Sequence, residues 1–434
     1  MLTRLNKLKS TAVDAIKERK EARSGRYLVA LDIGTENVKA LIGRIDGDEV
    51  EIVGAGKAHQ NLSDMQAGAI ADIAAVTDNC NKALADAEKE AGVSARAVVI
   101  GIAGELVKGT TITVKVQRRE AKKPLEIEEV ERIIGLVQNR AFDKAKQQIA
   151  DELGGKDIDV RLVNSALVQM EIDGYAVTNP VGFQGKEVKV QLYTAFAPMI
   201  HIGALEQVAH QLDMDLLAVA AEPFAVARSV IGDSADSALS AILMDVGGGT
   251  TDIAVLNEGG VQGTKMFGIG GRAFTRSVGR ELSVEFPVAE NLKVGLSSGR
   301  TPAARAEQVK KALMKTVQVW RSGVELALSE FQGLEHLPHQ ILLCGGGSSL
   351  KLLTSELEDS DWYRSLPFAR KPIVRYITPE TVAGITDGSE EPKDHTFITA
   401  MGLLRVGLDT IAQGDDSKDK EQSVSGKINR LLRI

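Results

Sequence analysis

The chain has 434 residues, which is too many for one ordinary hydrophobic core, so we expect two or more domains. Its hydrophobic fraction of 44% and charged fraction of 26% are those of a soluble globular protein. The net charge of −7 gives no electrostatic reason to expect nucleic-acid binding, and we expect none. The two cysteines, Cys80 and Cys344, are too few and too far apart for a disulfide framework or a cysteine zinc site.

Both ends of the chain bear on whether the protein meets a membrane. No apolar stretch reaches the roughly 18 residues of a membrane span, and the basic segment 1–26 lacks the apolar core of a signal peptide, so we expect a cytoplasmic protein. Segment 1–26 is amphipathic, because one helical face gathers the apolar side chains Leu2, Leu5, Leu8, Ala12, Val13 and Ile16. It can be a membrane contact, a partner helix or a segment docked on its own domain, and the sequence does not distinguish these.

The first predicted elements are buried strands and helices. Residues 27–33 and 38–45 are apolar runs separated by four residues, which predicts a β-hairpin. An alanine-rich helix within 64–92 and a buried strand at 97–104 follow. Residues 105–197 predict a compact α+β insertion, with a strand at 110–116, a helix at 127–150 and strands near 160–172 and 186–196.

The second half of the chain repeats the strand–turn–strand pattern. Its predicted elements are a helix at 202–212, a strand–turn–strand at 240–256, a mainly helical region at 272–335, a strand–turn–helix at 341–353 and a helix at 397–412. Polar and charged residues then predict a flexible linker, followed by a short amphipathic end.

The first glycine-containing turn lies in LDIGTENVKALIG, residues 31–43. Gly34 at the hairpin tip leaves backbone N–H groups free to face a phosphate, and Thr35 adds a hydroxyl. Asp32, at the strand end, can hold the hydration shell of Mg²⁺. Taken alone, the same residues also fit an ordinary hairpin with a capping threonine.

The second turn lies in LMDVGGGTTDIAVL, residues 243–256. Three consecutive glycines cost about 0.5–1 kcal/mol each relative to alanine in regular structure, so something requires close approach to this backbone. The predicted phosphate-binding residues of this turn are Gly247, Gly248, Gly249, Thr250, Thr251 and Asp252. Asp245 is predicted to face Mg²⁺ through water. A purely structural turn does not need this combination, so the sequence favours a nucleotide site.

The third turn is CGGGSSL, residues 344–350, in which a strand passes through glycines into a helix. We expect Gly345, Gly346, Gly347 and Ser348 to lie against the adenosine or the α-phosphate. The chain contains no P-loop and no G-x-G-x-x-G opening a βαβ unit. Two aspartate-containing hairpins and a glycine turn in this order resemble the actin, Hsp70 and sugar-kinase superfamily. That resemblance implies an α/β, actin-like two-domain ATPase fold that binds ATP and Mg²⁺ in the cleft between the domains.

Within that superfamily, the order of the segments resembles the FtsA cell-division family over nearly the whole chain. The resemblance implies that an SHS2-like α+β subdomain, residues 105–197, is inserted in the first domain. The implied parts are a first actin-like domain at 27–104, 198–239 and 397–412, a second domain core at 240–271 and 336–396, its helical subdomain at 272–335, a linker at 413–425 and a tail at 426–434. The type IV pilus protein PilM has a similar insertion and is the alternative.

The resemblance also assigns roles to residues outside the turns. Glu222, in AEPFAVARSV, is implied to lie at the cleft floor and orient a water toward the γ-phosphate. Its local sequence equally fits a glutamate at a helix start beside Pro223. Glu290 and Lys293, in VAENLKVGLSSG, are implied to reach the ribose or base, although by spacing alone they are an ordinary charge pair on a helix surface.

The first hairpin departs from the family pattern. Glu36 and Asn37 stand where the family has a small hydroxyl residue and a lysine. Lys39 can supply the missing positive charge to a bound nucleotide, but from a different part of the hairpin.

The C-terminal residues have an amphipathic pattern that resembles the membrane-targeting helix of FtsA proteins. One helical face carries the apolar residues, and basic residues flank it; the set is Val424, Lys427, Ile428, Arg430, Leu431, Leu432 and Arg433. So short a helix binds a lipid surface weakly as one copy and well when a polymer presents many. A disordered basic tail is the alternative.

Together these features imply an ATP-binding, actin-like cell-division protein that forms filaments at the inner face of the cell membrane. It would anchor FtsZ at the division site and bind other division proteins through residues 105–197, with slow or absent ATP hydrolysis. A PilM-like cytoplasmic adaptor of pilus assembly is the second reading. A sugar kinase or chaperone ATPase is the third, although no sugar-binding insertion is recognisable.

Overall fold

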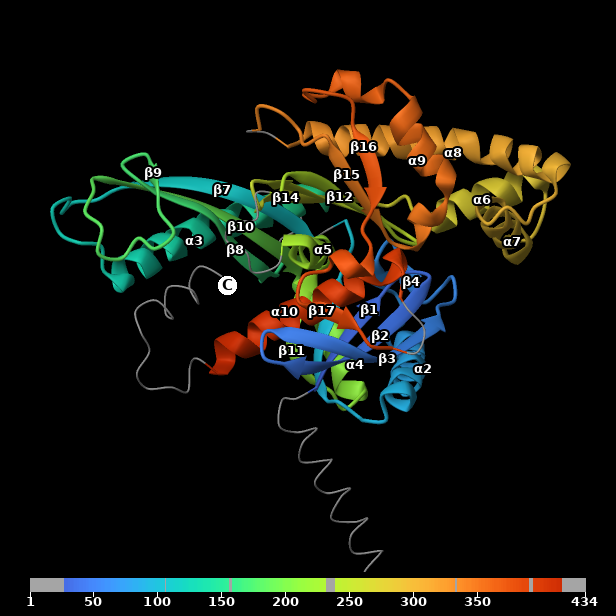
Figure 1. Ribbon diagram of the computed structural model, residues 1–434, viewed down its shortest axis with the longest axis horizontal. Coiled ribbons are helices and arrows are strands. Elements are labelled where there is room, and N and C mark those ends of the chain that lie inside the picture. The colour runs from blue at the N-terminus through green and yellow to red at the C-terminus, as the bar shows by residue number, and fades with distance from the viewer. Residues whose placement is uncertain are drawn as a thin grey trace, which may run out of the picture.

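The computed structural model describes residues 27–105, 107–155, 158–231, 239–331, 334–389 and 393–415. Two large sheets organise these residues, one in a first domain and one that runs from the second domain into the insertion (Figure 1). No helix among the described residues is long and apolar enough to cross a membrane. The predicted N-terminal segment and the C-terminal linker and tail, from residue 416 on, lie outside the described residues.

The first domain is built on a six-stranded sheet in the order β11-β6-β1-β2-β3-β17. Its strands are β1 (Tyr27–Ile33), β2 (Asn37–Asp46), β3 (Glu49–His59), β6 (Ala97–Ile102), β11 (Asp215–Ala221) and β17 (Ile385–Asp387), with a small hairpin of β4 (Met65–Gln66) and β5 (Ala69–Ile70) beside it. β1 and β2 form the predicted hairpin; β1 is buried from Leu28 to Ile33, and buried and half-buried residues alternate along β2 near the tip.

Among the described residues, four helices complete the first domain: α2 (Ile73–Ala91), α4 (Met199–Gln211), α5 (Glu222–Ile231) and α10 (Ile398–Asp415). The predicted alanine-rich helix begins at Ile73 because the Asp72 carboxylate caps it by accepting from the amide of Ala75. It ends, as predicted, at Gly92. α5 and α10 pack on each other and against the sheet, so the last folded helix returns to the first domain.

The insertion consists of β7 (Lys108–Gln117), α3 (Ile127–Glu152), β8 (Val160–Ile172), β9 (Tyr175–Ala176) and β10 (Glu187–Pro198). It projects to the left in Figure 1. The i, i+3, i+4, i+7 side chains Val130, Ile133, Ile134 and Val137 of α3 are buried on the sheet, with Val190 and other strand residues. The insertion therefore has a hydrophobic core of its own.

The second domain contains β12 (Ala241–Val246), β13 (Thr251–Asn257), β14 (Gly260–Phe267), β15 (Gln340–Cys344) and β16 (Ile373–Tyr376). Its helices are α6 (Gly271–Leu282), α7 (Phe286–Ser297), α8 (Ala303–Ser329) and α9 (Lys351–Asp359). Short 3-10 helices are η1 (Gly346–Ser349), η2 (Trp362–Ser365), η3 (Pro379–Thr381) and η4 (His395–Phe397). Trp320 of α8 is fully buried in this core, and its indole donates to the hydroxyl of Thr251 at 2.9 Å.

Two details of the fold differ from the sequence expectation. The insertion interrupts the first domain in the chain, yet β7 pairs with β14 of the second domain through Gly109 and Thr110, so the two form one nine-stranded sheet. The third glycine turn leads into the 3-10 helix η1, and α9 starts only at Lys351, because Leu350 is extended and interrupts the helix. Neither feature has a local sequence signal.

Candidate nucleotide-binding site

A cavity of about 310 Å³ lies between the two domains, and all three glycine turns line it. The predicted residues that line it are Asp32, Gly34, Thr35, Lys39, Glu222, Asp245, Gly247, Gly248, Thr250, Asp252, Glu290, Lys293, Gly345, Gly346 and Gly347. Residues separated by more than 300 positions in the chain are thus brought to one site. The sequence patterns identified them one by one, and the fold assembles them.

Three predicted residues lie beside the cavity rather than on its wall. Gly249 faces a neighbouring cavity of about 390 Å³ on the other side of the hairpin tips. The hydroxyl of Thr251 donates to the carbonyl of Ile269 and accepts from Trp320, so it serves the fold of the second domain. The hydroxyl of Ser348 is buried and donates to the carbonyl of Gly345 at 2.7 Å, which stabilises the third turn.

The two hairpins place equivalent pairs of residues at the cavity. In the first, Asp32 of β1 lies opposite Lys39 of β2; in the second, Asp245 of β12 lies opposite Asp252 of β13. Both pairs come one to two residues before the tip, where the strands end and the side chains meet the space between the domains. The first hairpin thus carries an acid and a base where the second carries two acids.

The glycines are required partly because the turns touch one another. A Cβ on Gly248 would lie 2.7 Å from Cβ of Glu36, and one on Gly249 would lie 2.6 Å from the hydroxyl of Thr35. Gly345 has a φ of +81°, and its Cβ would lie 1.9 Å from a carboxylate oxygen of Asp245. Close packing of three turns, as well as access to bare backbone, therefore accounts for the glycine runs.

The ammonium group of Lys39 binds the carboxylate of Asp32, with Nζ and Oδ2 2.8 Å apart. Asp32 is buried, and Lys39 is partly buried. Burial alone lowers the pKa of Lys39, but the charge and hydrogen bond of Asp32, with the charges of Asp245 and Glu222, raise it above its usual value. Lys39 is therefore charged and faces the acidic end of the cavity.

The remaining carboxyl groups of the site are held away from water. Burial, reinforced by the neighbouring charges of Asp32, Asp252 and Asp245, raises the pKa of Glu222 well above its ordinary range. Burial and Asp245 do the same to Asp252, which accepts from the Thr250 hydroxyl at 3.1 Å through one oxygen while the other is buried without a partner. Burial also raises the pKa of Asp245, although Thr399 donates to it.

These partners bear on the predicted Mg²⁺ site. Within the described residues, no three histidine, cysteine, aspartate or glutamate side chains gather closely enough to hold a metal ion. Asp32 is engaged by Lys39, and one oxygen of Asp245 is engaged by Thr399. The donor set therefore does not fit a metal ion bound by these carboxylates as they stand.

On the nucleoside side, Glu290 and Lys293 of α7 form an ion pair of 2.8 Å that faces the cavity. Lys293 also donates to the carbonyl of Gly271 at 3.1 Å and to the hydroxyl of Thr275 at 2.9 Å. Thr275 in turn donates to Glu290. The pair is thus tied to α6 and lines the site, rather than lying on a solvated helix face.

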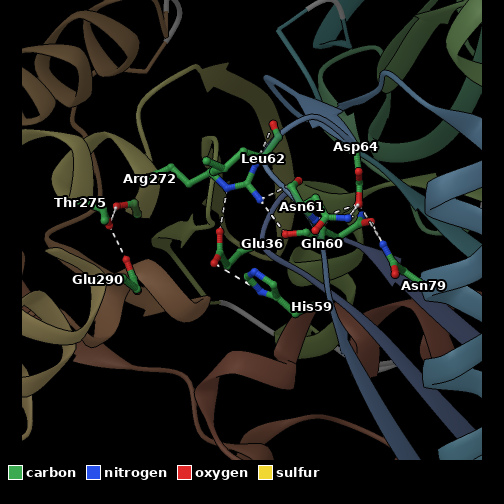
Figure 2. A network of polar contacts seen from close by, with 12 residues as sticks. Glu36, His59, Gln60, Asn61, Leu62, Asp64, Asn79, Arg272, Thr275 and Glu290 are labelled. Atoms are coloured by element: carbon green, nitrogen blue, oxygen red, sulfur yellow. Dashed lines mark hydrogen bonds and ion pairs between the residues drawn. The ribbon is translucent and has the colours of Figure 1, made fainter. Parts of the chain in front are cut away.

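Sequence reasoning missed Arg272, which joins the two domains across the cleft (Figure 2). Its Nε lies 2.7 Å from a carboxylate oxygen of Glu36, and its other nitrogens donate to the carbonyls of Gln60, Asn61 and Leu62 at 3.2–3.5 Å. Arg272 is 4% exposed although it is charged. The sequence signal for this contact was Glu36, an acidic residue at a hairpin tip that requires a basic partner.

A second set of polar contacts fixes the loop that receives Arg272. The side-chain amide of Asn79, on α2, donates to Gln60 and to Asp64, both at 3.0 Å. Asp64 also accepts from the backbone amide of Asn61 at 2.8 Å. Figure 2 shows these residues on the first-domain side of the contact. Arg272 therefore binds carbonyls whose positions are already set by the first domain.

Comparison with known proteins shows which protein family this chain resembles. The family model described as "Cell division protein FtsA" matches residues 242–402, from β12 to α10. The FtsA of Pseudomonas aeruginosa is 25% identical over 93% of this chain and 93% of its own length. The chain is related to the FtsA proteins. The FtsA of Neisseria meningitidis is 26% identical, over 88% of this chain and 90% of its own, and that of Escherichia coli K12 is 25% identical, over 95% and 98%.

Among solved structures, one titled "PilM-PilN type IV pilus biogenesis complex" matches with a TM-score of 0.61 at 17% identity. The match covers 88% of this chain and 98% of that one. At this identity the likeness concerns the fold. The predicted actin-like α/β fold and the resemblance to FtsA are both confirmed, and the chain is similar to cell-division proteins along nearly its whole length.

Proposed function

We propose that this FtsA relative is an ATP-binding cell-division protein. The observation that carries the proposal is the convergence of three glycine turns, from two domains, on one cavity. The backbone of Gly34, Gly247 and Gly248 and the hydroxyls of Thr35 and Thr250 would hold the phosphates. Lys293, Glu290 and the third turn would hold the nucleoside. The relationship to proteins named for cell division supplies the cellular context.

We propose further that the protein assembles into filaments at the inner face of the membrane and anchors FtsZ there. The support is the FtsA resemblance and the amphipathic pattern of residues 424–433. Residues 105–197 would bind later division proteins. In favour of this, the insertion has its own core and exposes aromatic side chains, since Tyr175 is 78% and Phe183 50% exposed.

For ATP hydrolysis we propose a slow rate. Glu222 lines the cavity, as a residue that orients a water must. Its raised pKa favours the protonated carboxyl, which cannot accept a proton from water. Glu222 is thus better suited to donate a hydrogen bond at neutral pH than to act as a general base.

The test is co-sedimentation of the full chain with anionic lipid vesicles and FtsZ, with and without ATP. We expect ATP to increase the FtsZ that pellets with the vesicles. A Gly345→Ala variant is the nucleotide-site control, because its Cβ has no room beside Asp245. Sedimentation of FtsZ that is equal with and without ATP, or equal in the variant, would contradict the proposal.

The PilM likeness lies in the fold and does not by itself favour a pilus adaptor over a division protein. The two differ in what the protein holds at the membrane. Co-purification from cells with FtsZ would support division, whereas co-purification with a pilus-assembly membrane protein would favour the alternative.

A further inference from the structure

The cation-binding end of the nucleotide cavity already contains a cation, the ammonium group of Lys39. We propose that Lys39 takes the place of the divalent metal ion, so that the protein binds a nucleoside triphosphate as the metal-free anion. This inference rests on the proposed nucleotide function of the same cavity. It concerns the charge state of the ligand, which the glycine turns alone do not determine.

The position of Lys39 is fixed by the register of the first hairpin. Lys39 is the cross-strand partner of Asp32, the carboxylate that the sequence predicts for Mg²⁺. The Nζ–Oδ2 distance of 2.8 Å is that of a charge-assisted hydrogen bond, and the two side chains are 13% and 5% exposed. Asp245 also acts on this ammonium through its charge. The carboxyl groups expected around a metal ion thus surround a lysine.

A metal ion would have to compete with this arrangement. If Mg²⁺ took Asp32, Lys39 would remain in the cavity as a buried charge without its partner and beside a second cation, which is unfavourable. Mg²⁺ also requires near-octahedral oxygen ligands and gives up its water reluctantly. Asp245 accepts from Thr399 and Asp252 accepts from Thr250, each through one oxygen, so a metal ion would have to share these carboxylates with the hydroxyls.

The cavity also presents further basic side chains to a triphosphate. Lys57, the cross-strand partner of Lys39 on β3, lines it, and so do Lys293 and Arg272. Of these, Lys293 and Arg272 are paired with Glu290 and Glu36. Lys39, itself paired with Asp32, and Lys57 are adjacent lysines on the phosphate side of the site. A ligand with several negative charges suits two adjacent ammonium groups better than a ligand neutralised by a metal ion does.

The test is the affinity of the full chain for ATP, measured by calorimetry in excess Mg²⁺ and in excess EDTA. We expect the two dissociation constants of the wild-type chain to agree within about threefold. A loss of affinity of about tenfold or more in EDTA would overturn the inference while leaving the nucleotide function intact. If ATP bound in neither condition, the proposed function itself would fail.

Two variants sharpen the result. Lys39→Met should lose affinity about tenfold or more in EDTA and regain it in Mg²⁺, because Asp32 becomes free for the metal ion. Lys57→Met, which alters the neighbouring lysine without touching Asp32, should lose affinity equally in both conditions. Circular dichroism checks that each variant folds. If Lys39→Met does not fold, the ATP affinities of the wild-type chain in Mg²⁺ and in EDTA decide the question. Equal affinities of a folded Lys39→Met in the two conditions would also contradict the inference.

Discussion

The contact of Arg272 with Glu36 makes a prediction about how firmly the cleft is closed. Arg272 comes from α6 of the second domain, and all of its side-chain partners belong to the first domain. Replacement by methionine keeps much of the apolar stem and removes every one of these bonds. The contact should then open more often, and the backbone bonds around it should open with it.

The magnitude follows from burial and charge. Removing one partner of a buried ion pair costs about 3–5 kcal/mol, but Glu36 is a quarter exposed, so water recovers part of that cost. We therefore expect Arg272→Met to lower the free energy of local opening by about 2 kcal/mol, which is about thirtyfold in the opening equilibrium. Glu36→Gln retains an acceptor oxygen and should lower it by about 1 kcal/mol.

Hydrogen exchange measures this opening without requiring the whole chain to unfold. The reporters are the amides of Gly271 and Arg272, which bond to the carbonyls of Gly247 and Gly248, and the amide of Gln60, which bonds to Glu36. Exchange should accelerate at these amides and not within α3, whose contacts lie in the insertion. Arg305→Met, at a half-buried arginine near the start of α8 and away from the cleft contact, is the control.

The double variant decides whether Glu36 and Arg272 act together. If they do, the effect of Glu36→Gln should largely vanish in the Arg272→Met background, giving a coupling energy of about 1 kcal/mol. Strictly additive effects, or acceleration spread evenly over both domains, would refute the view that this pair holds the cleft closed.

Three further predictions concern other parts of the molecule. Gly345→Ala should abolish ATP binding, measured by calorimetry. Gly346 lies in the same turn but has open space around its Cβ, so circular dichroism should show an intact fold for Gly346→Ala. Glu222→Gln should gain stability relative to wild type in urea denaturation as the pH rises from about 5 to 8. The sign follows because the folded state keeps a proton on Glu222 that the unfolded chain loses near pH 4.5, so the free energy of unfolding of wild type falls as the pH rises. A stability difference between the two proteins that stays constant with pH would contradict this prediction. Removal of residues 424–434 should reduce binding to anionic vesicles by about tenfold or more while ATP affinity is unchanged, and equal sedimentation of both chains would exclude the tail as the membrane contact.

The sequence could predict the parts of the site that consist of local patterns. Each glycine turn has its own signature, and the order of the turns was sufficient to place them on one fold. The partners of the first hairpin could not be predicted in the same way. Glu36 and Arg272 are 236 positions apart, and nothing in either local sequence names the other. The pairing of β7 with β14 was missed for the same reason, since it joins strands from two predicted domains by only two residue pairs.

The ion pair of Glu36 with Arg272 leads to a conclusion about nucleotide binding. Glu36 pairs with Arg272 across the cleft, so this ion pair joins the two domains without a ligand, whereas Lys39 pairs with Asp32 of its own hairpin. A ligand shifts a conformational equilibrium only by the difference in its affinity for the two states. The Glu36–Arg272 contact therefore leaves ATP less to shift in wild type than in Arg272→Met, which populates the open state more. We expect ATP to slow exchange at the Gly271 and Gln60 amides more in Arg272→Met than in wild type. Equal protection by ATP in both proteins would mean that the nucleotide, and not the Glu36–Arg272 pair, closes the cleft.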